Sequence, residues 1–281
     1  MFYLYPDSKK LYCSFIIIVF CTAFFLSSPA YADLTGRQIM EKQKELHKVA
    51  TEYGEEVMLL VETKSGDKES REVKRYTKDT GNDLNKYLLV FLKPADIRST
   101  ALLTHENSSR DDDQWLYMPA VKKLKRIAAS SKKSYFMGTD FTYEDMAPED
   151  IDNFTYTVLK TEKIEQDNKV NDCYVIETIP LNKEKAKSSA YSKRILWIGK
   201  TNFLTLKIEF YDRRKRLIKT QKSFAFENIA GTVYRPGKII MDNLRKKHKT
   251  LTLIKKRVIN QAIDNSVFTE RFILNNKHVN Q

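Results

Sequence analysis

Short segments in which an apolar residue fills every second position recur along most of this chain. The two-residue period is clear in residues 154–158 and 204–210, residues 57–61 and 88–92 are short apolar runs, and polar segments separate one such stretch from the next. Successive side chains of a β-strand point to opposite faces of a sheet, so this period is typical of strands. The spacing predicts about ten or eleven strands in an antiparallel meander, and therefore a mainly β fold.

A hairpin and an initial helix give this pattern its clearest boundaries. Apolar residues at 204, 206, 208 and 210 line one face of a strand that turns near Asp212–Lys215 and returns. The segment TLTLIKKRVI, 250–259, adds a late strand. A loose apolar stripe from Thr35 to about Glu56 predicts one amphipathic helix, with Thr35 as its N-cap and Gly54 as its stop signal.

Glycine and proline are scarce, with eight and seven residues in the whole chain. No stretch rich in Pro, Gly or Ser marks a linker within residues 33–281, and no internal repeat is visible. We therefore expect a single α+β domain of mainly β type, built on one antiparallel, strongly curved sheet with a few helices. Such a sheet has a concave face, and we expect helices to cover it.

The first segment, 1–32, has the layout of a secretory signal peptide. Lys9 and Lys10 form a basic n-region, Leu11–Leu26 is almost wholly apolar, and Ala30-Tyr31-Ala32 has the small-x-small pattern of a cleavage site. We expect cleavage after Ala32, which leaves residues 33–281 as the exported domain. A retained membrane anchor is the alternative, but this apolar stretch is short for a span of about 20 residues.

The cysteines fit neither a lipid anchor nor a disulfide. Cys13 and Cys21 lie in the signal segment, but each follows a large aromatic residue, so we expect a protein that is not a lipoprotein. Cleavage leaves Cys173 as the single cysteine, so no disulfide within the chain can form and the fold must rest on its core. We interpret Cys173 as a small buried hydrophobe rather than a reactive thiol.

The chain carries a formal net charge of +13 at pH 7. A chain this basic is attracted to anionic surfaces, and for an exported protein these are membrane head groups or an acidic partner. Export argues against nucleic acid as a partner, although the basic runs at 122–126 and 213–216 would suit it. The alternative is that the lysines only solvate an apolar sheet and blunt its edges.

Catalytic and metal-binding patterns are missing from the sequence. The four histidines are scattered, and the chain has no nucleophile elbow, zinc-protease motif, phosphate-binding loop or dinucleotide fingerprint. The consecutive acids Asp111–Asp113 point in different directions and lack the alternation of a calcium loop. Asp140, Glu144 and Asp145 have no recognisable partner for acid–base chemistry. We expect no enzyme, no cofactor and no metal site.

The stretch DDQWLYMPAVKKLKRIAASSKKSYFMGTDFTYEDM, 112–146, is unusually apolar for so polar a chain. The four residues WLYM at 115–118 are adjacent, so large side chains would point to both faces of one strand. A second group of aromatic residues and methionine follows at 136–143. Something apolar must therefore cover both faces of the sheet in this region.

This stretch resembles the signature of the outer membrane lipoprotein-sorting protein family, the LolA-like group of periplasmic lipid-binding domains. The matching elements are DQWLY at 113–117 with Pro119, the basic run that ends in Arg126-Ile127, and FMGTDFTYED at 136–145. The resemblance implies a half-open β-barrel, a half-barrel sheet whose concave face is covered by helices and holds acyl chains. It also implies a periplasmic location and an association with transporters of the RND superfamily.

Physical reasoning agrees with a lipid carrier. An acyl chain gains about 0.8 kcal/mol per methylene removed from water, so a free lipid tail hardly crosses an aqueous compartment. The residues predicted to bind lipid are Trp115, Leu116, Tyr117, Met118, Phe136, Met137, Phe141 and Tyr143. The basic residues predicted to contact a partner or lipid head groups are Lys122, Lys123, Lys125 and Arg126. For each apolar residue taken singly, ordinary core packing is the alternative explanation.

The sequence leaves two functions open. The first is a periplasmic carrier that moves lipid or lipoprotein acyl chains between membranes, or to and from an RND-type transporter. The second is a non-carrying accessory or sensor module of such a transporter, which would use the basic residues to hold its partner. An anionic membrane surface is a further partner that the charge allows.

Overall fold

The computed structural model describes residues 1–2, 34–81, 83–108 and 110–280. The expected signal segment and its cleavage site thus lie outside the described residues, apart from Met1 and Phe2. The contacts of the chain group Leu34–Gln281 into one compact unit. Within the described ranges, no helix is long and apolar enough to cross a membrane.

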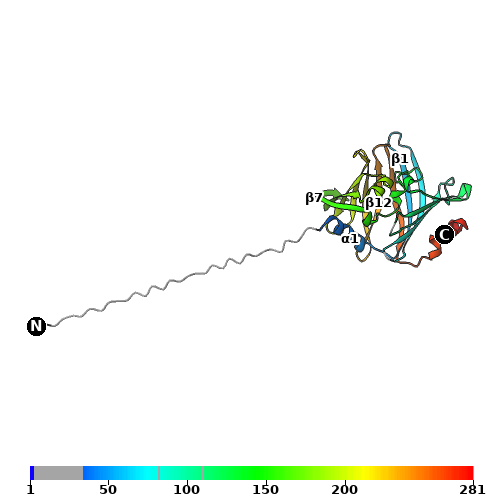
Figure 1. The fold of residues 1–281 in the computed structure, drawn as a ribbon. Coiled ribbons are helices and arrows are strands. Elements are labelled where there is room, and N and C mark those ends of the chain that lie inside the picture. The colour runs from blue at the N-terminus through cyan, green and yellow to red at the C-terminus, as the bar shows by residue number, and fades with distance from the viewer. Residues whose placement is uncertain (3–33, 82, 109, 281) are drawn as a thin grey trace. The chain divides into compact units, whose positions relative to one another are not determined.

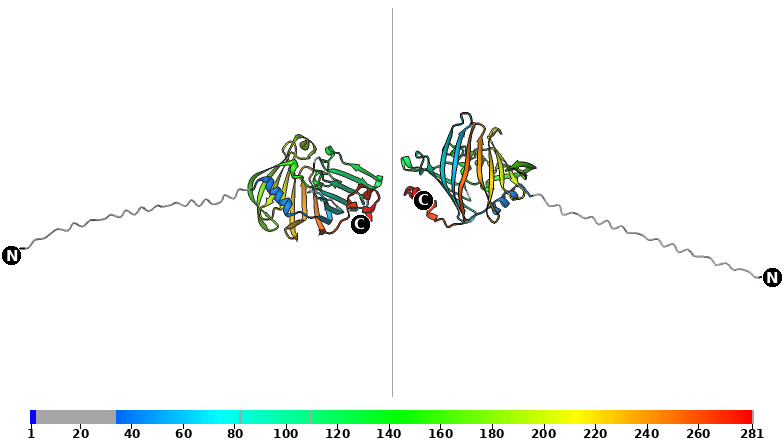
Figure 2. Two further views of the ribbon diagram at one scale, coloured as in Figure 1. Left: turned by 60° about the horizontal axis from the view of Figure 1, so that its bottom comes forward. Right: turned by 180° about the vertical axis from the view of Figure 1, so that it is seen from behind.

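The described residues contain one antiparallel sheet of thirteen strands (Figure 1). Its strands are β1 (Thr51–Glu62), β2 (Lys68–Asp79), β3 (Asn85–Lys93), β4 (Ala101–His105), β5 (Asp113–Met118), β6 (Lys123–Arg126), β7 (Phe154–Gln166), β8 (Lys169–Pro180), β9 (Lys193–Gly199), β10 (Thr205–Tyr211), β11 (Leu217–Ala230), β12 (Val233–Asn243) and β13 (His248–Ile259). Their order is β6-β5-β4-β3-β2-β1-β13-β12-β11-β10-β9-β8-β7, so β6 and β7 are the two edges. The sheet curls without closing (Figure 2).

The predicted mainly β fold with one antiparallel sheet is confirmed, but the expected count of about ten or eleven strands was too low. The shortest strands explain the difference. β6 has four residues, three of them cationic, and β4 has five. Segments this short hold too few residues to show a two-residue period.

Three α-helices accompany the sheet in the described part of the chain: α1 (Gly36–Leu46), α2 (Lys183–Ser188) and α3 (Glu270–Leu274). Thr35 is the N-cap of α1, and it exchanges hydrogen bonds with Gln38 in a capping box. The predicted helix was too long, because the expected stop signal Gly54 lies inside β1. Pairing of β1 with both β2 and β13 outweighs the weak helical pattern there.

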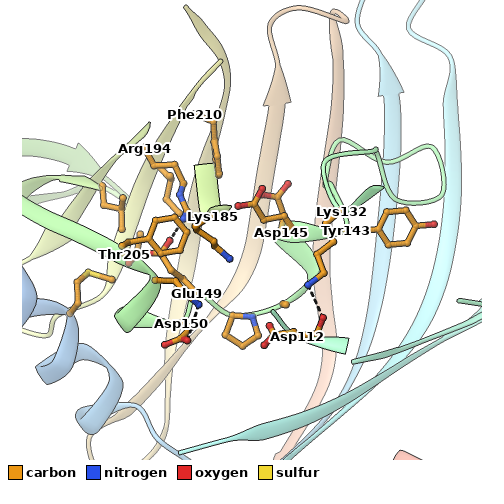
Figure 3. Close-up of a pocket in the computed structure, with 18 of the residues that line it drawn as sticks. Asp112, Lys132, Tyr143, Asp145, Glu149, Asp150, Lys185, Arg194, Thr205 and Phe210 are labelled. Carbon is orange, nitrogen blue, oxygen red and sulfur yellow. Dashed lines mark hydrogen bonds and ion pairs between the residues drawn. The ribbon is translucent and has the colours of Figure 1, made fainter. Parts of the chain in front are cut away.

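Residues 127–153, here called the strap, connect β6 to β7. These strands follow each other in the chain but lie at opposite edges of the sheet. The strap must therefore cross the molecule, and it runs over the concave face (Figure 3). Its regular structure consists of the 3-10 turns η2 (Ala129–Ser131), η3 (Glu144–Met146) and η4 (Ile151–Asn153).

Two different elements cover the concave face. Ile39 of α1 packs with Ile176 of β8 and Leu196 of β9. Elsewhere the strap provides the cover, and Phe136 lies in the same buried cluster as Met58 of β1. The predicted cover of several helices is therefore not confirmed: one helix and one largely irregular segment share the task.

The end of the chain covers the convex face of β3–β5. Its buried residues are Val267, Phe268, Phe272 and Ile273, which form one cluster with Leu88, Val90, Ala101, Leu103 and Tyr117. These strands are thus apolar on both faces and covered on both, as the run at 115–118 predicts.

Candidate functional site

The strap fills one end of the concave face with its own side chains. Phe136 is inaccessible to solvent, and its ring centroid lies 5.6 Å from that of Phe91 on β3. Phe141 of the strap and Leu116 of β5 belong to the same buried cluster. The signature segment therefore forms closed core at this end.

The fold divides the eight residues predicted to bind lipid into three groups. Leu116, Phe136 and Phe141 are buried between the strap and the sheet, and Met118, Met137 and Tyr143 pack at the border of the same cluster. Trp115 and Tyr117 belong to the cluster on the convex face. Of the eight, Tyr143 lines the open hollow described below. Lipid binding by this set stays a prediction.

The C-terminal segment holds Trp115 and Tyr117 on the convex side. The Tyr117 hydroxyl donates to Asn276 Oδ1 at 3.0 Å, and its ring meets His278 edge-on at 5.3 Å. The Trp115 ring lies 5.1 Å from His105. These contacts explain why two large residues point away from the concave face.

A buried ion pair anchors the strap to β11. Lys219 is 1% exposed, and its ammonium donates to Asp145 Oδ2 at 2.5 Å and to the Asp140 carbonyl oxygen at 3.1 Å. The rings of Tyr191 and Phe210 lie 4.9 and 4.7 Å from the same ammonium. Burial lowers the pKa of Lys219, and the Asp145 carboxylate opposes that shift. Asp145 is therefore a structural anchor.

Asp140 ties the strap to β13 in the same way. Thr250 Oγ1 donates to Asp140 Oδ2 at 2.8 Å, and His248 Nδ1 lies 2.7 Å from the same oxygen. On the other side, Arg71 of β2 donates to the Met137 carbonyl oxygen. Asp140 and Asp145, two of the acids considered for catalysis, thus join the strap to the sheet, and their partners lie too far away in the sequence to be recognised from it.

Two adjoining hollows remain open on the concave face. Their volumes are about 270 and 750 Å³, and the smaller is drawn in Figure 3. Met40 and Gln43 of α1 and residues 147–150 of the strap line both. Pockets for small ligands measure about 300–1,000 Å³, so the two hollows have room for an amphiphile.

The smaller hollow combines apolar and charged walls. Its apolar wall includes Met40, Leu196, Ile208 and Phe210. The charged groups beside it include Arg194 and Glu149, which form an ion pair. The Tyr156 hydroxyl also donates to Glu149, at 2.6 Å. One wall thus suits a hydrocarbon tail, and Arg194 and Glu149 beside it compensate each other's charge.

Paired charges also line the larger hollow, among them Glu52, Arg75 and Arg235. Glu52 accepts from Arg235 at 2.9 Å and from Arg257 at 2.8 Å. Arg75 donates to Glu56 at 2.9 Å. The open space is therefore more polar than the apolar cavity that the resemblance implies, because the strap occupies the apolar end of the concave face.

The predicted basic contact residues lie at the edge of the sheet. Lys123 and Lys125 are exposed on β6, and Lys122 is exposed just before it in the left-handed conformation, with φ 49°. Arg126 differs from these three, because it donates to the Asp113 carboxylate. Arg110, and then Arg126, hold the pKa of Asp113 well below its usual range. Contact of these residues with a partner stays a prediction.

Three histidines and Cys173 contribute to the packing and hydrogen bonding of the fold. His47, His105 and His278 each place Nε2 within 3.0 Å of a backbone carbonyl oxygen distant in the sequence. Cys173 is fully buried, and burial raises the pKa of its thiol to about 11, as expected of a small hydrophobe. No group of three or more His, Cys, Asp or Glu side chains in the described ranges could hold a metal ion.

Sequence reasoning missed most residues that line the hollows. The alternation at 204–210 locates a strand, and it carries Ile208 and Phe210, but it does not show which face meets the hollow. Met40 lies in the predicted helix without marking a site. Lys219 gave no signal at all, since a lysine within a strand normally points to solvent.

Comparison with known proteins gives consistent matches. A family model described as "-like: Uncharacterized protein" matches residues 83–275. An outer membrane lipoprotein-sorting protein domain from Vibrio parahaemolyticus is 28% identical, with a TM-score of 0.78 over 85% of this chain and 98% of that one. A DUF1329 family protein from Desulfovibrio piger is 27% identical, with a TM-score of 0.77 over 85% and 97%. A LolA superfamily protein from Nitrosomonas europaea, 24% identical, shares the fold with a TM-score of 0.65 over 85% and 99%. No curated protein matches the sequence.

Proposed function

Since the chain belongs to the outer membrane lipoprotein-sorting protein family, the LolA-like group, we propose that it is a periplasmic carrier of lipid or lipoprotein acyl chains. It would take up its cargo from one membrane, or from an RND-type transporter, and deliver it to another. The signal-like segment 1–32 supports export to this compartment.

The observation that carries this proposal is the pair of adjoining hollows on the concave face. A lipid carrier needs space for a tail beside an apolar wall, within a surface that stays compatible with water. The smaller hollow supplies the wall through Leu196, Ile208 and Phe210, and the larger adds about 750 Å³ of room next to it. Because the apolar wall is limited, the cargo would be held no more tightly than a membrane holds it.

The first test fills the hollow with a side chain. Ile208 is half-buried at the wall, so Ile208→Trp should occupy the space of the tail without disrupting the core. We expect gently purified wild-type protein to carry lipid and the variant to carry severalfold less, measured by native mass spectrometry and lipid extraction.

Leu159→Trp is the matched control, because Leu159 is 50% exposed on the edge strand β7 and lies outside both hollows. It should leave the lipid content unchanged. Wild-type protein that carries no lipid and takes up no fluorescent fatty acid would end the carrier proposal.

The basic edge of the sheet favours a second candidate, an accessory module that binds a membrane transporter. Lys122, Lys123 and Lys125 are exposed together at β6 and form a basic patch at the edge of the sheet. Reversing the three charges to Glu should abolish binding to inner-membrane vesicles and leave the lipid content constant.

Reversal of Lys163, Lys169 and Lys222, which are exposed elsewhere on the sheet, is the control with the same change in charge. If both triple variants bind the vesicles equally well, β6 holds no partner. If binding persists on protein-free liposomes, the edge contacts lipid rather than a transporter.

A further inference from the structure

Lys132 of the strap and Lys185 of α2 border the smaller hollow (Figure 3), and neither ammonium is hydrogen-bonded to a carboxylate of the described residues. The Lys132 ammonium donates to the backbone carbonyl oxygen of Asp112 at 2.7 Å, not to its side chain. The nearest carboxylate oxygen to Lys185 belongs to Asp111, at 3.9 Å, which is beyond hydrogen-bond distance. Both ammonium groups therefore keep free donors, as far as the described residues show.

Two hydrogen-bond acceptors at the same place, the Asp112 carboxylate and Gln114 Oε1, also have unfilled acceptor capacity in the described part of the chain. Asp112 lines both hollows, and among the described residues its carboxylate accepts one bond, from the Asn107 backbone N–H at 3.2 Å. Gln114 lines the smaller hollow and is only 1% exposed. Its Nε2 donates to the Tyr143 carbonyl oxygen at 3.0 Å, which fixes the orientation of the amide. Gln114 Oε1 then has no partner among the described residues.

These groups carry charge of both signs in a poorly solvated place. Burial raises the pKa of Asp112 to about 6; Glu106 adds to the shift, whereas Lys132 and Lys185 oppose it. Burial also lowers the pKa of Lys132, and Lys185 adds to that shift, whereas Asp111 and Asp112 oppose it. A ligand with one charge would satisfy one set of groups and repel the other, but a ligand with both charges would satisfy both.

We infer that this part of the smaller hollow binds the zwitterionic head group of a lipid that carries a phosphate and an ammonium. The phosphate lies against the Lys132 and Lys185 ammonium groups, and the ammonium lies against the Asp112 carboxylate and Gln114 Oε1. The lipid tail then follows the wall of Leu196, Ile208 and Phe210 in the same hollow. This inference rests on the proposed carrier function and specifies the class of its cargo.

Three single-tailed probes with the same acyl length test the head group. They are a lysophospholipid with an ethanolamine head, which is zwitterionic, its glycerol-headed analogue, which carries phosphate alone, and an alkylamine, which carries ammonium alone. Binding is measured by displacement of a fluorescent apolar dye at monomeric lipid concentrations. We expect the zwitterion to bind about tenfold more tightly than either single-charge probe, since one charge-assisted hydrogen bond is worth such a factor.

Two single variants, each of which removes one charge, test the two halves of the site separately. Asp112→Asn should remove the advantage over the phosphate probe, and Lys132→Gln should remove the advantage over the amine. In the wild type, affinity for the zwitterion should fall as the pH drops through about 6, where Asp112 takes up a proton. Asp96→Asn and Lys133→Gln are the matched controls, because both residues are exposed and lie outside the two hollows.

The outcomes separate this inference from the carrier proposal. If all three probes bind the wild type equally, or if Asp112→Asn and Lys132→Gln behave like their controls, the head-group site is wrong and the carrier stands. If none of the probes displaces the dye, both proposals fall. Circular dichroism confirms that each variant is folded before its affinity is compared.

Discussion

At the scale of single residues, the most consequential feature is the buried ion pair between Lys219 and Asp145, which attaches the strap to the sheet. The Lys219 ammonium is almost inaccessible and depends on Asp145 for compensation. Asp145→Asn should therefore destabilise the fold by about 3–5 kcal/mol, since it leaves a buried ammonium without its counter-charge. Urea unfolding followed by circular dichroism measures the change in the free energy of unfolding.

The double variant Asp145→Asn, Lys219→Met is the control for this pair. It removes both charges and keeps the volume of the lysine stem, so it should recover a large part of the lost stability. A double variant that is no more stable than Asp145→Asn alone would show that the ion pair is not what the strap depends on.

At the scale of elements, the sequence predicted strands better than it predicted their surroundings. The hairpin expected around 212–215 is present as β10 and β11, with the Asp212 N–H bonded to the Arg216 carbonyl oxygen at 2.9 Å. Local alternation is enough for this, because strand and turn are decided within a few residues. The prediction that the first helix ends at Gly54 was wrong. The competing interaction is pairing with β13, which comes from residues about 200 positions later.

The candidate site was predictable only in part for the same reason. The sequence singled out an apolar stretch that needs cover on both faces, and the structure supplies both covers. It could not tell that Phe136 and Phe141 would fill the concave face themselves, or that Tyr117 would face the other way. Which face of β5 meets a hollow is decided by the strap and the C-terminal segment, and neither has a local signal for that role.

At the scale of the whole molecule, two sets of contacts join the late part of the chain to its early strands. Its first strand, β1, pairs with its last, β13, in the middle of the sheet, so the curved sheet is continuous from edge to edge. The residues after β13 then return to the convex face of β3–β5. There His105 Nε2 lies 2.8 Å from the Phe268 carbonyl oxygen, and His278 Nε2 lies 3.0 Å from that of Ser99.

This return should make the end of the chain a full part of the folding unit. Phe272 is 6% exposed in the convex cluster, so Phe272→Ala should lower the free energy of unfolding by about 3–5 kcal/mol. Leu274 lies two residues later in α3 and is 49% exposed, so Leu274→Ala should change stability by less than about 0.5 kcal/mol. Thermal and urea unfolding of the two variants measure the difference. Equal effects, or a separate early transition in wild-type protein, would mean that the C-terminal segment folds independently of the sheet, and the convex face of β3–β5 would then be open to other partners.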